Sequence, residues 1–69
     1  MSYRLTPLGE GRARRVVETR GPEDAILDFL YKVKDPVEFD EILDETQMDD
    51  STAKKVVNHL VLKEYVKEV

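Results

Sequence analysis

The 69-residue sequence predicts a single, mainly helical domain spanning residues 1–69, with a small antiparallel sheet formed by its two ends. Three observations support this fold class. Apolar residues recur at helical spacing through most of the chain, which is typical of amphipathic helices. Short segments with alternating or β-branched residues lie at both ends, as in strands. Glycine and proline separate the helical stretches, so four helices and a two-stranded terminal sheet are expected.

The chain begins with a predicted strand that leads directly into a helix. Apolar and polar side chains alternate in residues 2–5. Thr6 then suits a helix N-cap, and Pro7 suits the first helical position. Gly9 and Gly11 each cost this helix up to about 1 kcal/mol relative to alanine, so it needs tertiary support. The residues expected on its buried face are Leu5, Leu8, Ala13, Val16 and Val17.

Two more amphipathic stretches predict a second and a third helix. The second follows Gly21 and Pro22, and its apolar stripe comprises Ala25, Ile26, Phe29, Leu30 and Val33. The third is expected to start with a capping box, in which Asp35 is the N-cap, Pro36 follows it and Glu38 lies three residues after the cap. The apolar stripe of the third helix comprises Phe39, Ile42 and Leu43, and its solvated face comprises Asp40, Glu41, Asp44 and Glu45.

A fourth helix and a strand complete the predicted elements. Asp49 is expected to cap the helix. Its apolar stripe comprises Ala53, Val56, Val57 and Leu60. Residues 65–69 are rich in β-branched and aromatic side chains and predict a terminal strand. This strand is expected to pair antiparallel with residues 2–5 of the same chain, and pairing between two chains is the alternative.

The third and fourth helices, joined by a short turn, have the layout of a helix-turn-helix. Opposite its core stripe the fourth helix presents Ser51, Lys54, Lys55 and Asn58, with Gln47 and Thr52 near its start. Lysine suits phosphates or guanine edges, asparagine suits adenine, and hydroxyls suit either contact. Arg4 and Lys67 would flank this surface on the terminal strands. The alternatives are an ordinary solvated helix face and, for Arg4 and Lys67, an edge protected against aggregation.

Residues 37–66 resemble the helix-turn-helix and following strand of MarR-like winged-helix regulators. The residues that carry this resemblance are Phe39, Ile42, Leu43, Thr46, Met48, Asp49, Ser51, Thr52, Val56, Leu60, Lys63, Tyr65 and Val66. The segment YRLTPLGEGRARRVV resembles the return strand and C-terminal helix that usually follow the wing. Its position at the start implies a circularly permuted order, or a wing completed by another chain. Members often have glycine where this chain has Glu64.

The resemblance implies a winged helix-turn-helix that binds double-stranded DNA and regulates transcription, with a recognition helix over about residues 49–62. Few cations could reach phosphates, so a homodimer through the arginine-rich first helix is the predicted way to gain affinity. The arginines of this region, Arg12, Arg14, Arg15 and Arg20, are expected either to pair with acidic groups of the same fold or to contact phosphates.

The charge balance favours a competing function. The formal net charge is -4, distributed as +3 over residues 1–20 and -7 over the remainder, whereas DNA-binding domains are usually basic. Asp50 also counts against DNA unless it meets a hydrogen-bond donor. The competing expectation is a winged-helix protein-interaction domain that docks on a basic protein partner through its acidic helix 2 face, which is the solvated face of the third helix in this chain.

Composition excludes several other classes of function. With no cysteine and one histidine, disulfides, thiolate chemistry and a structural zinc site are not expected, and His59 is expected to be a structural residue at the border of the buried face. No cofactor and no enzymatic activity are predicted, because a ligand-sized cleft is not expected in so small a domain. Apolar runs are too short for a membrane span, so a cytoplasmic protein is predicted. The charge-rich, amide-poor composition is typical of thermophiles.

Overall fold

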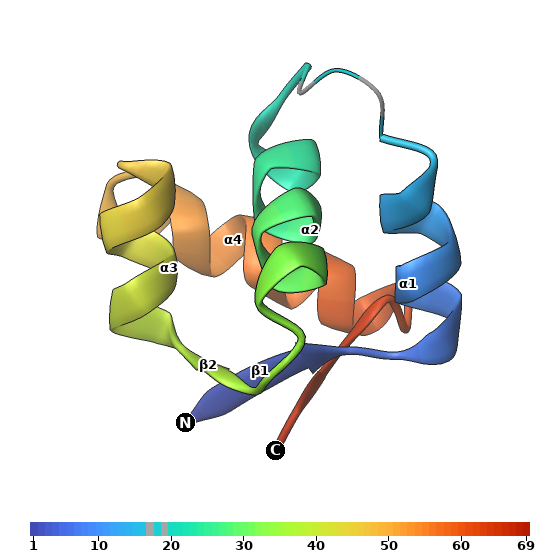
Figure 1. Ribbon diagram of the computed structural model, residues 1–69. Helices are drawn as coiled ribbons and strands as arrows, with labels where there is room; N and C mark the ends of the chain where they lie inside the picture. The colour runs from blue at the N-terminus through green and yellow to red at the C-terminus, as the bar shows by residue number, and fades with distance from the viewer. Residues whose placement is uncertain (17, 19) are drawn as a thin grey trace.

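The computed structural model describes residues 1–16, 18 and 20–69, and Val17, predicted to face the core, lies outside them (Figure 1). The described elements are mainly helical, with the helices lying on one side of a small sheet. In chain order they are β1 (Ser2–Leu5), α1 (Pro7–Arg14), α2 (Pro22–Val33), β2 (Val37–Glu38), α3 (Phe39–Thr46), α4 (Asp50–Leu62) and β3 (Val66–Glu68).

The two terminal strands pair antiparallel within one chain, as predicted. Arg4 lies opposite Lys67, and Leu5 lies opposite Val66. The sheet has three strands instead of the expected two, because β2 also pairs with β1 and gives the order β2-β1-β3. The strand that begins the chain is therefore the central strand, and it joins two segments that are far apart in the sequence.

The predicted capping box of the third helix is wrong. Asp35 and Pro36 lie in the connection after α2, and α3 begins later, at Phe39, with the extended residue Glu38 at its N-cap position. Val37 is fully buried and lies opposite Tyr3 in the sheet. Burying Val37 and pairing it with β1 therefore keep this segment extended, although its local pattern is typical of a helix start.

The core surrounds α2, which packs against α1, α3, α4 and β1. The buried apolar residues are Ala13, Ile26, Leu27, Leu30, Val37, Ile42, Ala53, Val57, Leu60 and Val66. The predicted stripes of α3 and α4 contribute to this core as expected. Leu27 belongs to it although the sequence pattern did not indicate this, whereas Val33 is 37% exposed. Within the described residues, no helix combines the length and apolar character that crossing a membrane requires.

The position of Leu8 is a further correction, because the residue is 57% exposed instead of buried. The face that α1 turns to the interior consists of Gly9 and Ala13. A Cβ built on Gly9 would lie 1.8 Å from the backbone oxygen of Tyr65, so only glycine allows α1 to approach this closely. The close approach turns Leu8 away from the core.

Among the residues that the structure describes, three non-glycine residues adopt left-handed backbone conformations where the chain changes direction. Lys34 ends α2 with φ 66°, Gln47 ends α3 with φ 59°, and Glu64 follows α4 with φ 65°. An L side chain costs on the order of 1 kcal/mol in this conformation. Glu64 thus makes a left-handed turn without glycine, and the turn directs the chain from α4 into β3.

Candidate nucleic-acid interface

The start of α4 is fixed by Asp49, as predicted. Its carboxylate accepts a hydrogen bond from the Thr52 backbone N–H at 3.2 Å. A hydrogen bond from the Thr52 hydroxyl and this one from its backbone N–H, with a smaller contribution from the charge of Lys55, lower the pKa of Asp49 below its ordinary value. The carboxylate of Asp49 therefore caps α4. Asp50, the next residue, has no capping hydrogen bond, so its carboxylate stays available at the start of the helix.

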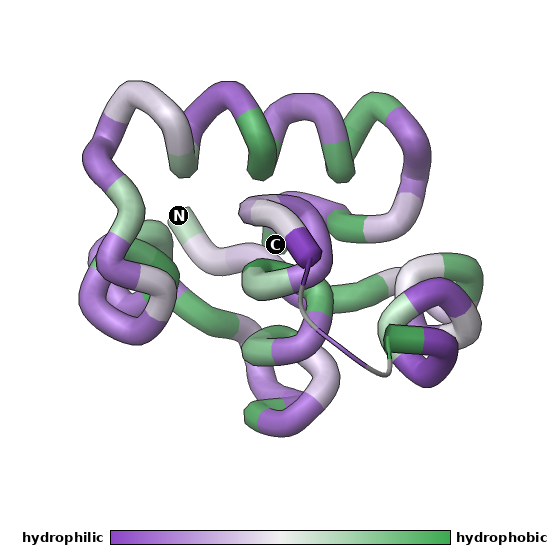
Figure 2. Tube along the Cα trace, turned by 90° about the horizontal axis from the view of Figure 1, so that it is seen from above, coloured by the Kyte–Doolittle hydropathy of each residue, from purple (hydrophilic) through white to green (hydrophobic). Residues whose placement is uncertain are grey.

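The exposed face of α4 carries the predicted polar side chains. Ala53, Val57 and Leu60 are buried, and Figure 2 shows the hydrophobic positions of α4 turned toward the rest of the molecule and the hydrophilic ones away from it. The exposed candidates are Gln47, Ser51, Thr52, Lys54, Lys55 and Asn58. The Thr52 hydroxyl donates a hydrogen bond to the Asp49 carboxylate. Among the described residues, the side chains of the other five form no ion pair and no hydrogen bond, so they are free to bind a partner.

One flank of α4 is instead tied to α2. The Lys63 ammonium lies 3.2 Å from one carboxylate oxygen of Glu23, and His59 Nδ1 lies 3.7 Å from the other. The His59 side chain is 58% exposed, so its expected place at the border of the buried face is wrong. Lys63 already has an acidic partner, which makes it a poorer candidate for phosphate contact than Lys54 or Lys55.

The opposite flank of α4 borders a hollow of about 290 Å³, which we call the α4–β1 hollow. Its lining residues are Met1, Tyr3, Phe39, Asp50, Lys54, Val57 and Asn58. Partial burial and the charge of Glu68 raise the pKa of Tyr3 at its edge, which keeps the phenol protonated. Sequence periodicity could not indicate the hollow, because its walls come from segments that are distant in the chain.

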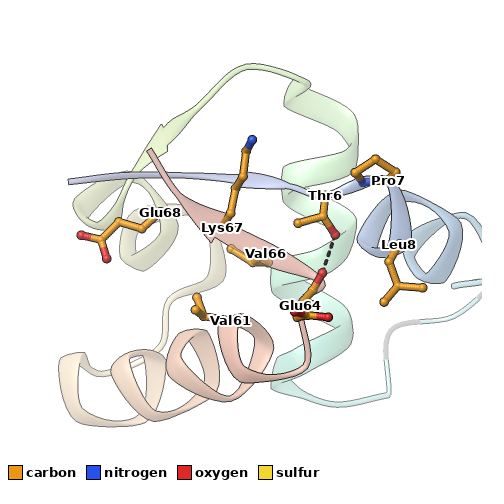
Figure 3. Close-up of a pocket in the computed structure, with 8 residues that line it drawn as sticks. All are labelled: Thr6, Pro7, Leu8, Val61, Glu64, Val66, Lys67 and Glu68. Atoms are coloured by element: carbon orange, nitrogen blue, oxygen red, sulfur yellow. Dashed lines mark hydrogen bonds between the residues drawn. The ribbon is translucent and has the colours of Figure 1, made fainter.

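Arg4 and Lys67 lie on a different surface from the α4 candidates. They are exposed cross-strand partners on β1 and β3. Their neighbours Leu5 and Val66 pack on the core, so alternation places Arg4 and Lys67 on the outer face of the sheet. Figure 3 shows the Lys67 side chain directed away from α4. The eight candidate residues, predicted to form one interface, thus divide into six near α4 and two on the sheet.

A second hollow, of about 550 Å³, lies between the start of α1 and the turn from α4 into β3 (Figure 3). We call it the Leu8 groove. Its lining residues are Thr6, Pro7, Leu8, Val61, Glu64, Val66, Lys67 and Glu68. The Thr6 hydroxyl donates a hydrogen bond to the Glu64 carbonyl at 2.5 Å and holds the two walls together. The groove combines an apolar floor with carboxylates at its edge.

The arginines of the first segment follow the predicted intramolecular pairing only in part. Arg12 lies 3.5 Å from the Asp24 carboxylate. Asp24 also accepts a hydrogen bond from the backbone N–H of Arg20 at 3.3 Å. The exposed side chains of Arg14, Arg15 and Arg20 form no ion pair with any other described residue. Arg14 and Arg15 therefore leave α1 with unneutralised positive charge.

Comparison of this chain with family models, curated proteins and solved structures finds no match.

Proposed function

We propose that this protein is a sequence-directed double-stranded DNA-binding module that regulates transcription, with α4 as its recognition helix. The observation that carries the proposal is the row of exposed, unpartnered side chains on α4, namely Ser51, Lys54, Lys55 and Asn58. They project from a helix that is held rigidly by its buried side and capped at its start. Because the helix is already folded, little conformational entropy is lost when these side chains enter a major groove, and the entropic cost of binding is lower.

The strand order supports a winged-helix assignment with permuted connectivity. Starting from α2, the elements run helix, strand, helix, helix, strand, and β1 and α1 would follow if the chain ends were joined. The Val69 backbone N–H donates a hydrogen bond to the Ser2 carbonyl at 2.8 Å, so the two ends lie side by side where a wing hairpin would turn. In this proposal the chain ends interrupt the wing, so the wing contributes fewer cations beside the recognition helix than an intact hairpin would.

A second copy of the chain would supply the missing cations, and the first helix is the surface we propose for it. Leu8 is exposed on α1, and a Cβ on Gly11 would meet no atom within 4 Å. Arg14 at the end of α1 and Arg15 after it carry positive charge, whereas Glu64 and Glu68 place carboxylates at the edge of the Leu8 groove. The α1 segment of one copy and the groove of the other therefore carry opposite charges, which favours a two-fold dimer.

Leu8→Asp is expected to convert the dimer into a monomer in sedimentation velocity at concentrations where the wild-type chain dimerises. The substitution places a carboxylate in an apolar groove that already has two glutamates at its edge, so burial there costs several kcal/mol by rough estimate. Leu62→Asp is the matched control, because Leu62 is 81% exposed on α4 and does not line the groove. A wild-type chain that is monomeric at high concentration, or equal effects of both substitutions, contradicts this dimer.

Lys55→Ala is expected to weaken duplex binding and to reduce the slope of log affinity against log salt by about 1, since one phosphate contact is lost.

Asn58→Ala is expected to relax base preference at one position, with a loss of about 1–3 kcal/mol for the preferred base. Fluorescence anisotropy with duplexes selected from a randomised library measures both effects. Lys32→Ala on α2 is the control, because the Lys32 ammonium is exposed, lies away from α4 in the sequence and pairs with Asp28 of its own helix. Unchanged affinity in both α4 variants excludes α4 as the recognition helix.

The exposed acidic face of α3 supports a second candidate function, docking on a basic protein. Its carboxylates are Asp40, Glu41, Asp44 and Glu45, and none of them forms an ion pair with another described residue. An NMR titration with random duplex DNA at low salt separates the two functions. Shifts confined to residues 47–59 favour DNA binding, whereas the absence of both shifts and affinity favours a protein partner.

A further inference from the structure

We propose that the α4–β1 hollow binds one nucleotide whose base carries an exocyclic amino group, either as a free nucleotide or as an unstacked nucleotide of a strand. This site shares Lys54 and Asn58 with the row of α4 that we propose for DNA contact, but it does not require that α4 bind duplex DNA. Its polar side chains and its aromatic side chains come from different elements of the fold. The two kinds of group thus face one small volume, as recognition of a nucleotide requires.

One wall of the hollow is a row of polar side chains on α4. Asp50, Lys54 and Asn58 follow one another at intervals of four residues and all line the hollow. Residues with this spacing lie one above the other on a helix face. The row therefore presents a hydrogen-bond acceptor, a positive charge and an amide in a fixed order along about two turns of helix.

The other wall is aromatic. Tyr3 on β1 and Phe39 at the start of α3 both line the hollow, and the buried residue Val57 lies at its base. Both rings are half-buried and packed against the core, so they are ordered without a ligand. Stacking of a base on such a ring contributes about 1–3 kcal/mol and does not depend strongly on which base is bound.

The charges in the hollow are available to a ligand. Asp50 and Lys54 are four residues apart on α4, yet they form no ion pair within 4.0 Å. Lys54 can therefore meet a phosphate, while Asp50 can accept a hydrogen bond from an amino group, as carboxylates do with the cytosine amino group. The nearby Met1 ammonium is paired with Glu38 at 3.1 Å, and Glu68 adds negative charge beside Tyr3. Among the described residues that line the hollow, Lys54 is thus the cation that remains available to a phosphate.

The size of the hollow limits the ligand to one base. Its volume of about 290 Å³ lies just below the range of about 300–1,000 Å³ that is typical of small-molecule sites. A stacked base pair cannot enter a space of this size. A base in a strand must first leave its stack, which costs a few kcal/mol in a duplex and less in a single strand.

The test is an NMR titration with four probes, dCMP, dTMP, oligo(dC) and oligo(dT), each followed through backbone amide shifts. Binding of dCMP or oligo(dC) is expected to shift Tyr3, Phe39, Lys54 and Asn58 together and to be about tenfold tighter than binding of the thymine probe. If dCMP causes these shifts, a free nucleotide is sufficient for binding. If only oligo(dC) causes them, the ligand is a nucleotide within a single strand. If none of the four probes shifts these residues at millimolar concentration, the proposal is wrong.

Matched variants separate binding in the hollow from binding at Lys55, which belongs to the exposed row of α4 but does not line the hollow. Lys54→Ala is expected to weaken binding of the cytosine probe about tenfold, and Asp50→Ala to remove the preference for cytosine over thymine. Lys55→Ala is the control, because Lys55 is a neighbouring exposed lysine that does not line the hollow. Equal losses for Lys54→Ala and Lys55→Ala would show general charge attraction and overturn the proposal. Duplex affinity that falls in Lys55→Ala, with unchanged binding of the cytosine probe, supports two separate surfaces.

Discussion

Gly9→Ala is expected to destabilise this protein by about 3 kcal/mol or more, because the added methyl group has no space. The new Cβ would lie 1.8 Å from the Tyr65 backbone oxygen and 2.7 Å from the Tyr65 carbonyl carbon. Relief requires α1 to move away from the turn between α4 and β3. A domain of this size has a total stability of roughly 3–10 kcal/mol, so the variant is expected to lose at least about a third of that stability.

Urea denaturation followed by circular dichroism measures this effect, and Gly11→Ala is its matched control. The same substitution is made in the same helix, but a Cβ at Gly11 meets no heavy atom within 4 Å. Gly11→Ala is expected to stabilise the monomer by up to about 1 kcal/mol through helix propensity. The comparison belongs at concentrations where the chain is monomeric. Two variants of equal stability would show that α1 and Tyr65 are not in close contact.

Thr6→Ala is expected to destabilise the protein by about 2 kcal/mol, because two hydrogen bonds are lost together. The Thr6 hydroxyl oxygen accepts from the Gly9 backbone N–H at 3.0 Å, and the hydroxyl donates to the Glu64 carbonyl at 2.5 Å. The first bond caps α1. The second connects residues 58 positions apart and therefore joins the start of the chain to the turn that precedes its last strand.

Thermal and urea denaturation of Thr6→Ser provide the control for this prediction. Serine keeps the hydroxyl, so both hydrogen bonds can form and the loss of stability is expected to stay near about 0.5 kcal/mol. If Thr6→Ser is as unstable as Thr6→Ala, the lost methyl group, and not the hydroxyl, accounts for the effect. Together with Gly9, Thr6 determines how closely α1 approaches the α4–β3 turn and thereby shapes the Leu8 groove.

Features that depend on neighbours in the chain were predictable from the sequence. The apolar stripes around Ile42 and Ala53 follow from helical spacing, and both residues are fully buried. The caps formed by Thr6 and Asp49 are equally local, since each bonds to a backbone N–H three residues later. The exposed row on α4 follows from the same periodicity, because knowing the buried side of a helix also identifies its opposite side.

The features that could not be predicted depend on contacts between segments far apart in the sequence. The periodicity of apolar residues does not indicate which distant segments come into contact. Asp35 and Pro36 have the local pattern of a helix start, but pairing of Val37 with Tyr3 keeps the chain extended there. Leu8 looks like a core residue on a helical wheel, but the glycine contact turns it to the surface. The sequence alone determined which side of each central helix is buried. Only the tertiary structure decided where the hollows lie and that Arg4 and Lys67 are separated from α4, because those positions depend on how β1 packs between β2 and β3.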